Sequence, residues 1–537
     1  MTNLDKAVEY SDSYKGRWLG EGLWTDDRPF DWIEKWARET PDNPAIIGPD
    51  GAISYAEFND RVLRCASGLH KAGIRHGDTV GLQIPNTPEI LIAYHSLQRI
   101  GAVPTLLHMP YRKGELVPLM SYGSVKAVVC WAGIESYDAV SLMLELKVDV
   151  ESLEQVIVAG GTAPEGTISF DQLCDSELAD IPKPAPDSPC VIGFTSGTSS
   201  APKAVVHPFY TMSSTHRLLS ARCGIEPADR VLSAPPFTHI YGVCISGIAL
   251  HAGAAVVLME MYSPPAFAEA LAKHKSTVMF CAPAHVLGAL HTGTLTPETT
   301  GWLKTAVLAG AACPEEVFSQ VEEAFTNATI YQMFGMTEIL MSMINPLDAP
   351  REIRATSIGT VSDGHEIRVC KPGSEVLDVG EEGELEFRGA FLFAGYFNNE
   401  EATKSCIRDG GWFRTGDLGK LDGEGNVYIT GRVKDIINRG GIKINPIDIE
   451  ALVDEHPKVF FSAVVPMPDP ILGEKACLFV QLKPGESITL QEVLDYLQES
   501  GVAKMRWPER LETIDTMPMT PTRKIIKGEL TKELEKR

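Results

Sequence analysis

The chain has 537 residues, of which 44% are hydrophobic and 22% charged, a composition typical of soluble globular proteins. Its formal net charge of −23 argues against a nucleic-acid partner or an anionic membrane surface, because both require a basic face. Length alone predicts three or four domain-sized units. The cysteines are scattered singly and form no C-x-x-C pair, which favours free, mostly buried thiols in a reducing cytoplasm over zinc sites or disulfides.

Residues 1–29 predict a loose, polar leader that contains Trp18 and Trp24 and does not resemble a signal peptide. Alternating strand and helix patterns follow, and they indicate parallel sheets covered by helices on both faces. A hairpin is predicted at 43–54, strands at 78–84, 102–107, 127–131, 155–158, 190–194, 231–233, 254–259, 277–281 and 305–308, and helices at 31–39, 56–72, 88–100, 211–222 and 241–250. The apolar segment 240–259 is therefore interpreted as a buried helix and strand, not as a membrane span.

The alternation of predicted strands and helices ends near residue 359. Short strands and tight turns up to about residue 430 predict a small β subdomain. From residue 435 onward, strands at 461–465 and 476–482 alternate with helices at 446–455 and 490–500, which predicts a separate α+β domain.

The stretch that ends in Lys203 is the first candidate site. Its residues are Thr195, Ser196, Gly197, Thr198, Ser199, Ser200, Ala201, Pro202 and Lys203. Backbone N–H groups in a small-residue loop after a strand can wrap an anion, and the lysine adds a positive charge. Polyphosphate fits such a loop, although it has no Walker sequence, and a Ser/Thr-rich surface turn remains the alternative.

Further stretches carry side chains suited to a nucleotide site. Small residues after a strand let a flat ring approach the backbone, a hydroxyl beside a carboxylate suits Mg²⁺, and an aspartate after a turn suits a ribose diol. The stretches are 235–242 with His239, 308–314, 331–338 with Thr337 and Glu338, 411–417 with Asp417, 431–435, 438–441 and 518–525. Each alone has an ordinary alternative as a turn, a helix cap or a solvated lysine.

Taken together, these motifs resemble the adenylate-forming superfamily of acyl-CoA synthetases, stand-alone adenylation enzymes and beetle luciferases. The resemblance covers nearly the whole chain. It implies an α/β fold whose large N-terminal domain, 1–433, has two α/β sheet subdomains and a small β-barrel at about 359–430. It also implies a small mobile α+β domain, 434–537, with its hinge at Lys434.

The resemblance implies a two-step reaction, in which ATP and a carboxylic acid give an acyl adenylate and pyrophosphate, and a thiol then displaces AMP. Catalytic roles would fall to Lys524, Thr337, Glu338 and His239, with Glu338 holding Mg²⁺. ATP and AMP would also contact Thr195 to Ser199, Lys203, Gly310, Ala311, Ala312, Tyr331, Gly335, Asp417 and Arg432. The acyl pocket would comprise His239, Ile240, Tyr241, Gly310, Phe334 and Gly335, and pantetheine would meet Arg439, Gly440 and Gly441.

The sequence departs from the family pattern in four places. Ser199-Ser200 stands where Thr-Gly is commoner, and Ala204 stands where Gly is usual. Arg523 replaces the usual Gly before Lys524, and Phe334 stands where Tyr is frequent.

The resemblance leaves the acid and the thiol open. Ile240 disfavours a catechol-type acid, because dihydroxybenzoate-activating relatives have Asn there, so an aromatic, alicyclic or medium-chain acid is expected. CoA is the expected acceptor, with a separate carrier protein as the alternative. A luciferase-like oxidase is a third possibility, and a non-catalytic relative is disfavoured because Lys524 and Glu338 are present. We expect a cytoplasmic monomer or homodimer without a nucleic-acid partner or a membrane span.

Overall fold

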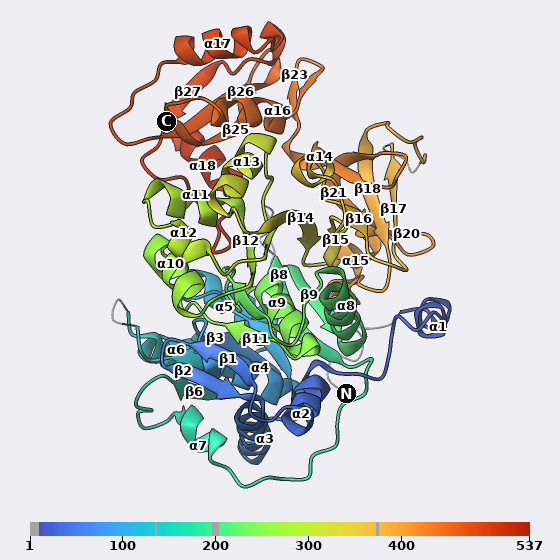
Figure 1. The fold of residues 1–537 in the computed structure, drawn as a ribbon, viewed down its shortest axis with the longest axis vertical. Coiled ribbons are helices and arrows are strands. Elements are labelled where there is room, and N and C mark those ends of the chain that lie inside the picture. The colour runs from blue at the N-terminus through green and yellow to red at the C-terminus, as the bar shows by residue number, and fades with distance from the viewer. Residues whose placement is uncertain (1–9, 135–136, 196–202, 372–374, 537) are drawn as a thin grey trace.

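The computed structural model describes residues 10–134, 137–195, 203–371 and 375–536. Two large sheets occupy the N-terminal part, a β-rich subdomain lies beside them, and the C-terminal domain lies at one end of the long axis (Figure 1). The predicted mixed α/β architecture with a separate C-terminal domain is thereby confirmed.

The first large sheet has eight strands. They are β3 (Thr79–Gln83), β4 (Val103–Leu106), β5 (Ala127–Trp131), β6 (Gln155–Ala159), β7 (Ile168–Ser169), β8 (Pro189–Thr195), β9 (Lys203–Pro208) and β19 (Gly395–Tyr396). Their order is β19-β9-β8-β4-β3-β5-β6-β7. The strands from β8 to β7 in this order pair in parallel, whereas β9 runs antiparallel to both β8 and β19. The carboxyl ends of the parallel strands therefore open on one edge, where ligands bind in such sheets.

The second large sheet has nine strands. They are β1 (Pro44–Gly48), β2 (Gly51–Ser54), β10 (Arg230–Ser233), β11 (Ala255–Val257), β12 (Val278–Cys281), β13 (Thr305–Leu308), β14 (Thr329–Met336), β15 (Leu340–Ile344) and β16 (Thr360–Val361). Their order is β16-β15-β14-β13-β12-β10-β11-β1-β2. The predicted hairpin is thus β1–β2, and it joins this sheet through parallel pairing of Ile46 with Val256.

Helices cover both sheets, as the alternation predicts. The helices of the N-terminal part are α1 (Asp12–Gly20), α2 (Pro29–Glu39), α3 (Tyr55–Lys71), α4 (Pro88–Arg99), α5 (Lys113–Tyr122), α6 (Ala139–Asp149), α7 (Phe170–Cys174), α8 (Phe209–Arg222), α9 (Ile240–Ala252), α10 (Pro264–Lys273), α11 (Pro283–His291), α12 (Pro297–Thr300), α13 (Glu315–Ala324) and α14 (Arg351–Thr356). One continuous core joins α3, α4, α8 and α9 to residues of both sheets. Separate cores place α5 and α6 on the first sheet, and α10, α11 and α13 on the second.

The β-rich subdomain and the C-terminal domain complete the chain. The former contains β17 (Glu366–Cys370), β18 (Gly383–Arg388), α15 (Glu400–Cys406), β20 (Ile407–Arg408), β21 (Trp412–Leu421) and β22 (Val427–Arg432). The latter contains β23 (Ile437–Arg439), β24 (Ile442–Ile444), α16 (Pro446–Asp454), β25 (Val459–Asp469), β26 (Gly473–Leu482), α17 (Leu490–Glu499), β27 (Arg510–Thr513) and α18 (Lys527–Lys536). A short 3-10 turn, Val433–Asp435, connects the two parts.

Helix α9 is the predicted buried helix. Every residue from Ile240 to Leu250 is buried, and Gly253 ends the helix in the left-handed conformation at φ 77°. None of the helices in the described residues combines the length and apolar character needed to cross a membrane.

The prediction of a loose leader is wrong for the residues that the structure describes. Ser11 caps helix α1 by accepting a hydrogen bond from Tyr14 N, and Trp18 is fully buried. Trp24 stacks on Tyr210 with ring centroids 4.9 Å apart, and its indole donates to Ala390 O at 2.9 Å. The segment is ordered by partners that lie far along the chain, and a local sequence pattern cannot reveal such partners.

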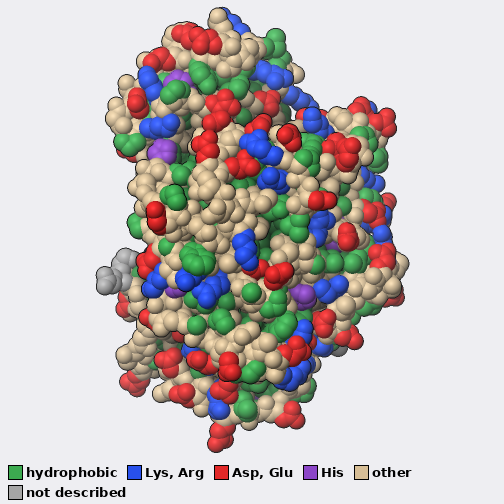
Figure 2. Space-filling model, in the orientation of Figure 1, with side chains coloured by type: hydrophobic (Ala, Val, Ile, Leu, Met, Phe, Trp, Pro, Cys, Tyr) green, Lys and Arg blue, Asp and Glu red, His purple; other side chains and the backbone are tan. Residues whose placement is uncertain are grey.

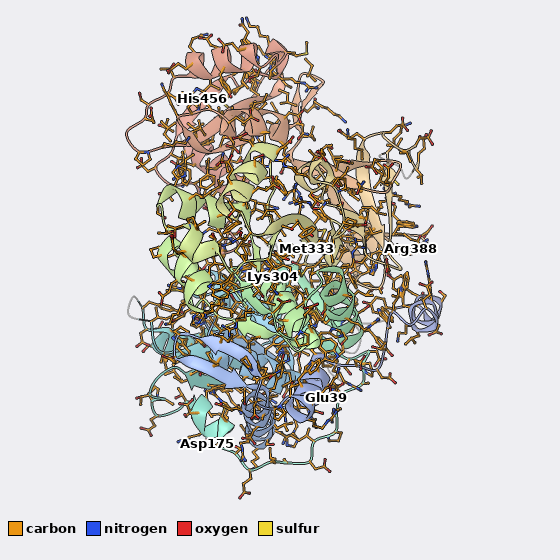
Figure 3. The ribbon with its side chains drawn as sticks, viewed as in Figure 1. Glu39, Asp175, Lys304, Met333, Arg388 and His456 are labelled. Atoms are coloured by element: carbon orange, nitrogen blue, oxygen red, sulfur yellow. The ribbon has the colours of Figure 1, made fainter. Side chains whose placement is uncertain are left out.

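The surface agrees with the acidic composition. Figure 2 shows Lys and Arg side chains interspersed among Asp and Glu side chains on the visible face. Figure 3 places Met333 of β14, a strand of the second large sheet, near the centre of the molecule, with Arg388 of the β-rich subdomain to its right and His456 of the C-terminal domain above it.

Candidate active site

The ends of strands β8 and β9 frame the predicted phosphate loop. Thr195 and Lys203 stand directly opposite each other in the antiparallel register. Four of the expected phosphate-binding residues, Ser196, Gly197, Thr198 and Ser199, lie outside the described residues. The described part of the motif is therefore a two-strand frame with one lysine at its end.

Lys203, Tyr396 and Glu338 form a connected group beside this frame. The Lys203 ammonium lies 4.8 Å from the centre of the Tyr396 ring, and the Tyr396 hydroxyl donates to Glu338 Oε1 at 2.7 Å. Burial raises the pKa of Glu338, while the Tyr396 hydrogen bond and the charges of Lys203 and Arg432 act in the opposite direction. The second carboxylate oxygen can still face a ligand, and such an oxygen is a good partner for a hard cation.

Thr337 is held from behind by a buried histidine. The Thr337 carbonyl lies 2.6 Å from His207 Nε2, so this nitrogen carries the proton, while His207 Nδ1 lies 3.0 Å from Thr211 Oγ1. Burial lowers the pKa of His207 to about 4, which keeps the ring neutral near pH 7. His207 thus fixes the backbone of the Thr337-Glu338 segment.

Asp417 and Arg432 face each other across strands β21 and β22. They are directly paired in register, and Arg432 Nε lies 2.7 Å from Asp417 Oδ1. Asp417 follows Gly416, whose φ is 73°, and its amide donates to Thr415 Oγ1. Burial raises the pKa of Asp417, and Arg432 and Lys524 oppose that rise. The pair offers a fixed carboxylate and a fixed guanidinium at the interface of the two domains.

Lys524 reaches this pair from the C-terminal domain. Lys524 is exposed, and it lies close enough to Arg432 and Asp417 for their charges to act on it. Desolvation lowers the pKa of Lys524 to about 8, with Arg432 contributing next. The structure thus brings together Lys203, Glu338, Asp417, Arg432 and Lys524, which are distant in the sequence.

The small-residue segment Gly310, Ala311 and Ala312 follows strand β13 and retains exposed surface. Gly310 has φ 86° and open space around the position of a side chain. Tyr331 is 5% exposed and its hydroxyl donates to Leu347 O at 3.0 Å, so the ring forms part of the wall behind β14. Phe334 and Gly335, farther along the strand, are more exposed.

His239, Ile240 and Tyr241 lie at the start of helix α9. His239 caps the helix by accepting a hydrogen bond from Tyr241 N, and its ring stacks on His108 with centroids 5.7 Å apart. Burial lowers the pKa of His239 to about 4, so its other nitrogen carries the proton near pH 7. A side chain on Gly193 would approach both Ile240 and Thr337, which places Ile240 beside the phosphate-loop strand. Tyr241 is buried, and its hydroxyl has no protein partner among the described residues.

The expected hinge residue lies near the Asp417–Arg432 pair, whereas the expected pantetheine residues have partners inside the C-terminal domain. Lys434 is close enough to Arg432 and Asp417 for their charges to act on it, and burial lowers its pKa. Arg439 instead pairs with Glu509, and Gly440 N donates to Leu472 O at 2.7 Å. The hairpin with Arg439, Gly440 and Gly441 therefore finds these partners inside the C-terminal domain, and the structure does not bring it to Lys524.

Sequence reasoning missed Tyr396, His207 and His108. Tyr396 follows a glycine in the aromatic run 391–397, a weak signal, and its place depends on pairing between β19 and β9. His207 lies within the buried strand β9 and His108 follows strand β4, and a structural histidine is equally expected in both places. Their partners come from other parts of the chain, so spacing could not identify them.

Removing the Tyr396 hydroxyl tests its contact with Glu338. For Tyr396→Phe, we expect an adenylation rate lower by about tenfold or more, because a hydrogen bond to a charged group contributes about 1.5–3 kcal/mol. The pKa of Glu338 should rise further, so the acid limb of the pH–rate profile should move to higher pH. Tyr122→Phe is the matched control, since the Tyr122 hydroxyl donates to Phe397 O at 2.6 Å. If both variants lower the adenylation rate equally, and by the same factor at every pH, the proposed contact of Tyr396 with Glu338 has no role in the reaction.

Comparisons with known proteins find relatives that match nearly the whole chain. The salicyl-AMP ligase / salicyl-S-ArCP synthetase of Mycobacterium tuberculosis is 32% identical, over 99% of this chain and 93% of its own length. The medium-chain fatty-acid–CoA ligase of Escherichia coli is 29% identical, over 100% and 95% of the two chains. ATP-bound MatB from Rhodopseudomonas palustris superposes with a TM-score of 0.85 at 28% identity, over 95% of this chain and 99% of that one. Its apo form gives a TM-score of 0.74 at the same identity and coverage.

Family models match both parts of the chain. The model described as AMP-binding enzyme matches residues 33–397, and the model described as AMP-binding enzyme C-terminal domain matches residues 448–524. The first match covers more than half of the chain and spans β8, β9 and the Thr337-Glu338 segment. The chain therefore belongs to the AMP-binding enzyme family, within the adenylate-forming superfamily of AMP-forming acid–thiol ligases.

Proposed function

We propose that this enzyme activates an aromatic, alicyclic or medium-chain carboxylic acid as its acyl adenylate and then transfers the acyl group to the thiol of CoA. The observation that supports this most strongly is the ion pair of Arg432 with the buried carboxylate of Asp417, 2.7 Å apart, whose charges act on Lys524 of the C-terminal domain. These three groups suit a carboxylate, an α-phosphate and a ribose meeting at one point. We also propose that the N-terminal domain is 1–433 and that Lys434 is the hinge of domain 434–537.

The nucleotide would lie between the two domains. Asp417 would accept hydrogen bonds from the ribose hydroxyls, and Arg432 would orient that carboxylate. The adenine would rest against Gly310, Ala311 and Ala312, with Phe334 and Gly335 near its edge and Tyr331 supporting the strand from behind. Thr195 to Ser199 and Lys203 would surround the β- and γ-phosphates. We infer a Mg²⁺ site on Glu338, whose buried carboxylate keeps one oxygen free of Tyr396; the ion would offset negative charge on the phosphates.

In the first step, a carboxylate oxygen of the acid attacks the α-phosphorus, the α–β phosphoanhydride bond breaks, and pyrophosphate leaves. Lys524 would bridge the carboxylate and the α-phosphate, and Thr337 would donate to the same phosphate. Positioning and charge neutralisation dominate such a transfer, because phosphoryl transfer needs little covalent chemistry from the protein.

In the second step, the thiolate attacks the acyl carbon, the bond to the adenylate oxygen breaks, and AMP leaves. We propose that the C-terminal domain first rotates about Lys434. The rotation would remove Lys524 and bring the hairpin of Arg439, Gly440 and Gly441 to the thiol entry. The separate position of this hairpin in the present structure is compatible with such an exchange, which is gating by domain movement.

The acyl chain would enter beside His239 and helix α9. His239 is neutral, and Tyr241 lies deeper among buried groups of the protein. Apolar surface on an aromatic or medium-chain acid would gain stability there by burial. His239 would direct the acid carboxylate toward Lys524.

The alternative acceptor is the phosphopantetheine arm of a separate carrier protein. The salicyl-S-ArCP synthetase relative gives this alternative its specific support, because its name includes a carrier. Purified enzyme should be given ATP, Mg²⁺ and a panel of benzoate, salicylate, 4-coumarate, cyclohexanecarboxylate and octanoate, with either CoA or a phosphopantetheinylated carrier. Acyl-CoA formation with at least one acid supports the proposal, whereas acylation of the carrier alone would transfer it to the alternative.

Substitution of Ile240 tests the acid specificity. For Ile240→Asn, we expect kcat/KM to rise for salicylate relative to benzoate by about fivefold, because the amide offers a hydrogen bond worth about 1 kcal/mol to the ring hydroxyl. Ile240→Val is the control, since it changes volume without adding polarity. An unchanged salicylate-to-benzoate ratio would place Ile240 outside the acyl pocket.

A further inference from the structure

Arg523 has an unusual backbone conformation. Its φ is 63°, in the left-handed region that residues with a side chain rarely adopt. Glycine would occupy this position without strain, yet the chain has arginine immediately before Lys524. A strained residue beside a functional lysine raises the question of what its side chain contacts.

The Arg523 side chain crosses to the N-terminal domain and lies on an aromatic ring. Its guanidinium carbon is 4.8 Å from the centre of the Tyr262 ring, within the range of a cation–π interaction. Tyr262 precedes helix α10, and its hydroxyl donates to His285 O at 2.6 Å. The ring also packs edge-on against His285 with centroids 4.6 Å apart. Tyr262 is thus fixed by its own domain at the place where Arg523 meets it.

A second ring contact joins the same parts of the two domains. His291, the last residue of helix α11, lies 4.4 Å from Phe460 of strand β25, measured between ring centroids. Figure 1 shows the C-terminal domain above α11 on this side of the molecule. The contacts Arg523–Tyr262 and His291–Phe460 therefore define one interface, which we call the domain clasp.

We propose that Arg523 is a positioning residue whose stacking on Tyr262 holds the C-terminal domain in the orientation that presents Lys524 for adenylate formation. Arg523 and Lys524 are adjacent, so loss of the first contact directly frees the second residue. Rotation for the thiol step has to break the clasp. The inference rests on the proposed function, because it assigns the clasp to the first of two half-reactions.

The first experiment compares the half-reactions in matched variants. Arg523→Gly removes the cation and the backbone strain together, so it should fold. Its pyrophosphate release should fall on the order of tenfold, the range of a partly desolvated cation–π contact, using the acid of the panel that wild type turns over fastest. Thioester formation from the synthetic adenylate of that acid should stay equal or become faster. Tyr262→Leu should behave like Arg523→Gly, while Arg523→Lys and Tyr262→Phe should retain most of the adenylation rate.

A second measurement needs no acid. Hydrogen–deuterium exchange of the full chain should show faster exchange in 283–291 and 520–526 for Arg523→Gly and Tyr262→Leu, and near-wild-type exchange for Arg523→Lys. Unchanged exchange and unchanged pyrophosphate release would overturn the inference, as would equal losses in both half-reactions. A wild-type enzyme that releases no pyrophosphate with any acid, but shows the exchange differences, would refute the proposed function and leave the clasp only as a structural contact, which also overturns its catalytic assignment.

Discussion

Lys524→Ala should lower acid-dependent pyrophosphate release by about 10²- to 10³-fold, the range seen when a preorganised charge is removed from a developing transition state. The reason is electrostatic, since the charges of Asp417 and Arg432 act on Lys524 from the other domain. Thioester formation from synthetic adenylate should be nearly unchanged, because the proposed rotation removes Lys524 from the site. Lys527→Ala is the matched control, as Lys527 pairs with Glu450 at 2.7 Å inside the C-terminal domain.

The same residue predicts a pH dependence with a definite sign. The pKa of Lys524 is lowered to about 8, so its ammonium form is present below that pH and is lost as the pH rises through it. We expect kcat/KM for adenylation, which reports the free enzyme, to decline above about pH 8 in wild type. That alkaline limb should disappear in Lys524→Ala. Equal losses in both half-reactions, or an unchanged alkaline limb, would contradict the assignment of Lys524.

Asp417→Asn should raise the KM for ATP by about 10²-fold or more, because two hydrogen bonds from ribose hydroxyls to a charged carboxylate contribute about 1.5–3 kcal/mol each. Asparagine keeps the size of the side chain but removes the charge that pairs with Arg432. Both half-reactions should suffer, since the ribose stays bound in both. Loss of Lys524 is thus expected to slow adenylate formation alone, whereas loss of Asp417 is expected to slow both half-reactions.

Glu384→Gln is the matched control for Asp417. Glu384 Oε2 lies 2.7 Å from Arg414 in the same β-rich subdomain, so this substitution also weakens an ion pair that has a buried carboxylate. It should lower thermal stability without a comparable rise in the KM for ATP. If Asp417→Asn leaves the KM for ATP unchanged, or if Glu384→Gln raises it equally, Asp417 is a structural residue and not the ribose ligand.

The fold was predictable where local patterns carry the information. The short buried strands and the apolar helix α9 follow from neighbouring residues. Strand partners that are far apart in sequence were not predictable. The hairpin β1–β2 pairs with β11, and Tyr396 reaches Glu338 because β19 pairs with β9. The leader was mispredicted for the same reason, since the contact of Trp24 with Ala390 is invisible to a local pattern.

In the candidate site, too, local motifs were informative and contacts between distant segments were not predictable. Resemblance in the motifs predicted roles for Lys203, Glu338, Asp417, Arg432 and Lys524; in the structure the charges of Lys203 and Arg432 act on Glu338, and those of Arg432 and Asp417 act on Lys524. The motif resemblance could not identify the residues that hold these side chains in place. The bond between His207 and the Thr337 carbonyl depends on the packing of β9 against the Thr337-Glu338 segment, and the Arg523–Tyr262 contact depends on the domain orientation.

Transfer of oxygen from the acid to AMP tests the central claim most directly. The acid that wild type turns over fastest should be labelled with ¹⁸O in its carboxylate and incubated with enzyme, ATP, Mg²⁺ and CoA. If the carboxylate attacks the α-phosphorus and the thiol then displaces AMP, mass spectrometry should find a single ¹⁸O in each AMP and unlabelled pyrophosphate. Label in pyrophosphate, or acyl-CoA formed with ADP and ¹⁸O-labelled phosphate, would contradict the account.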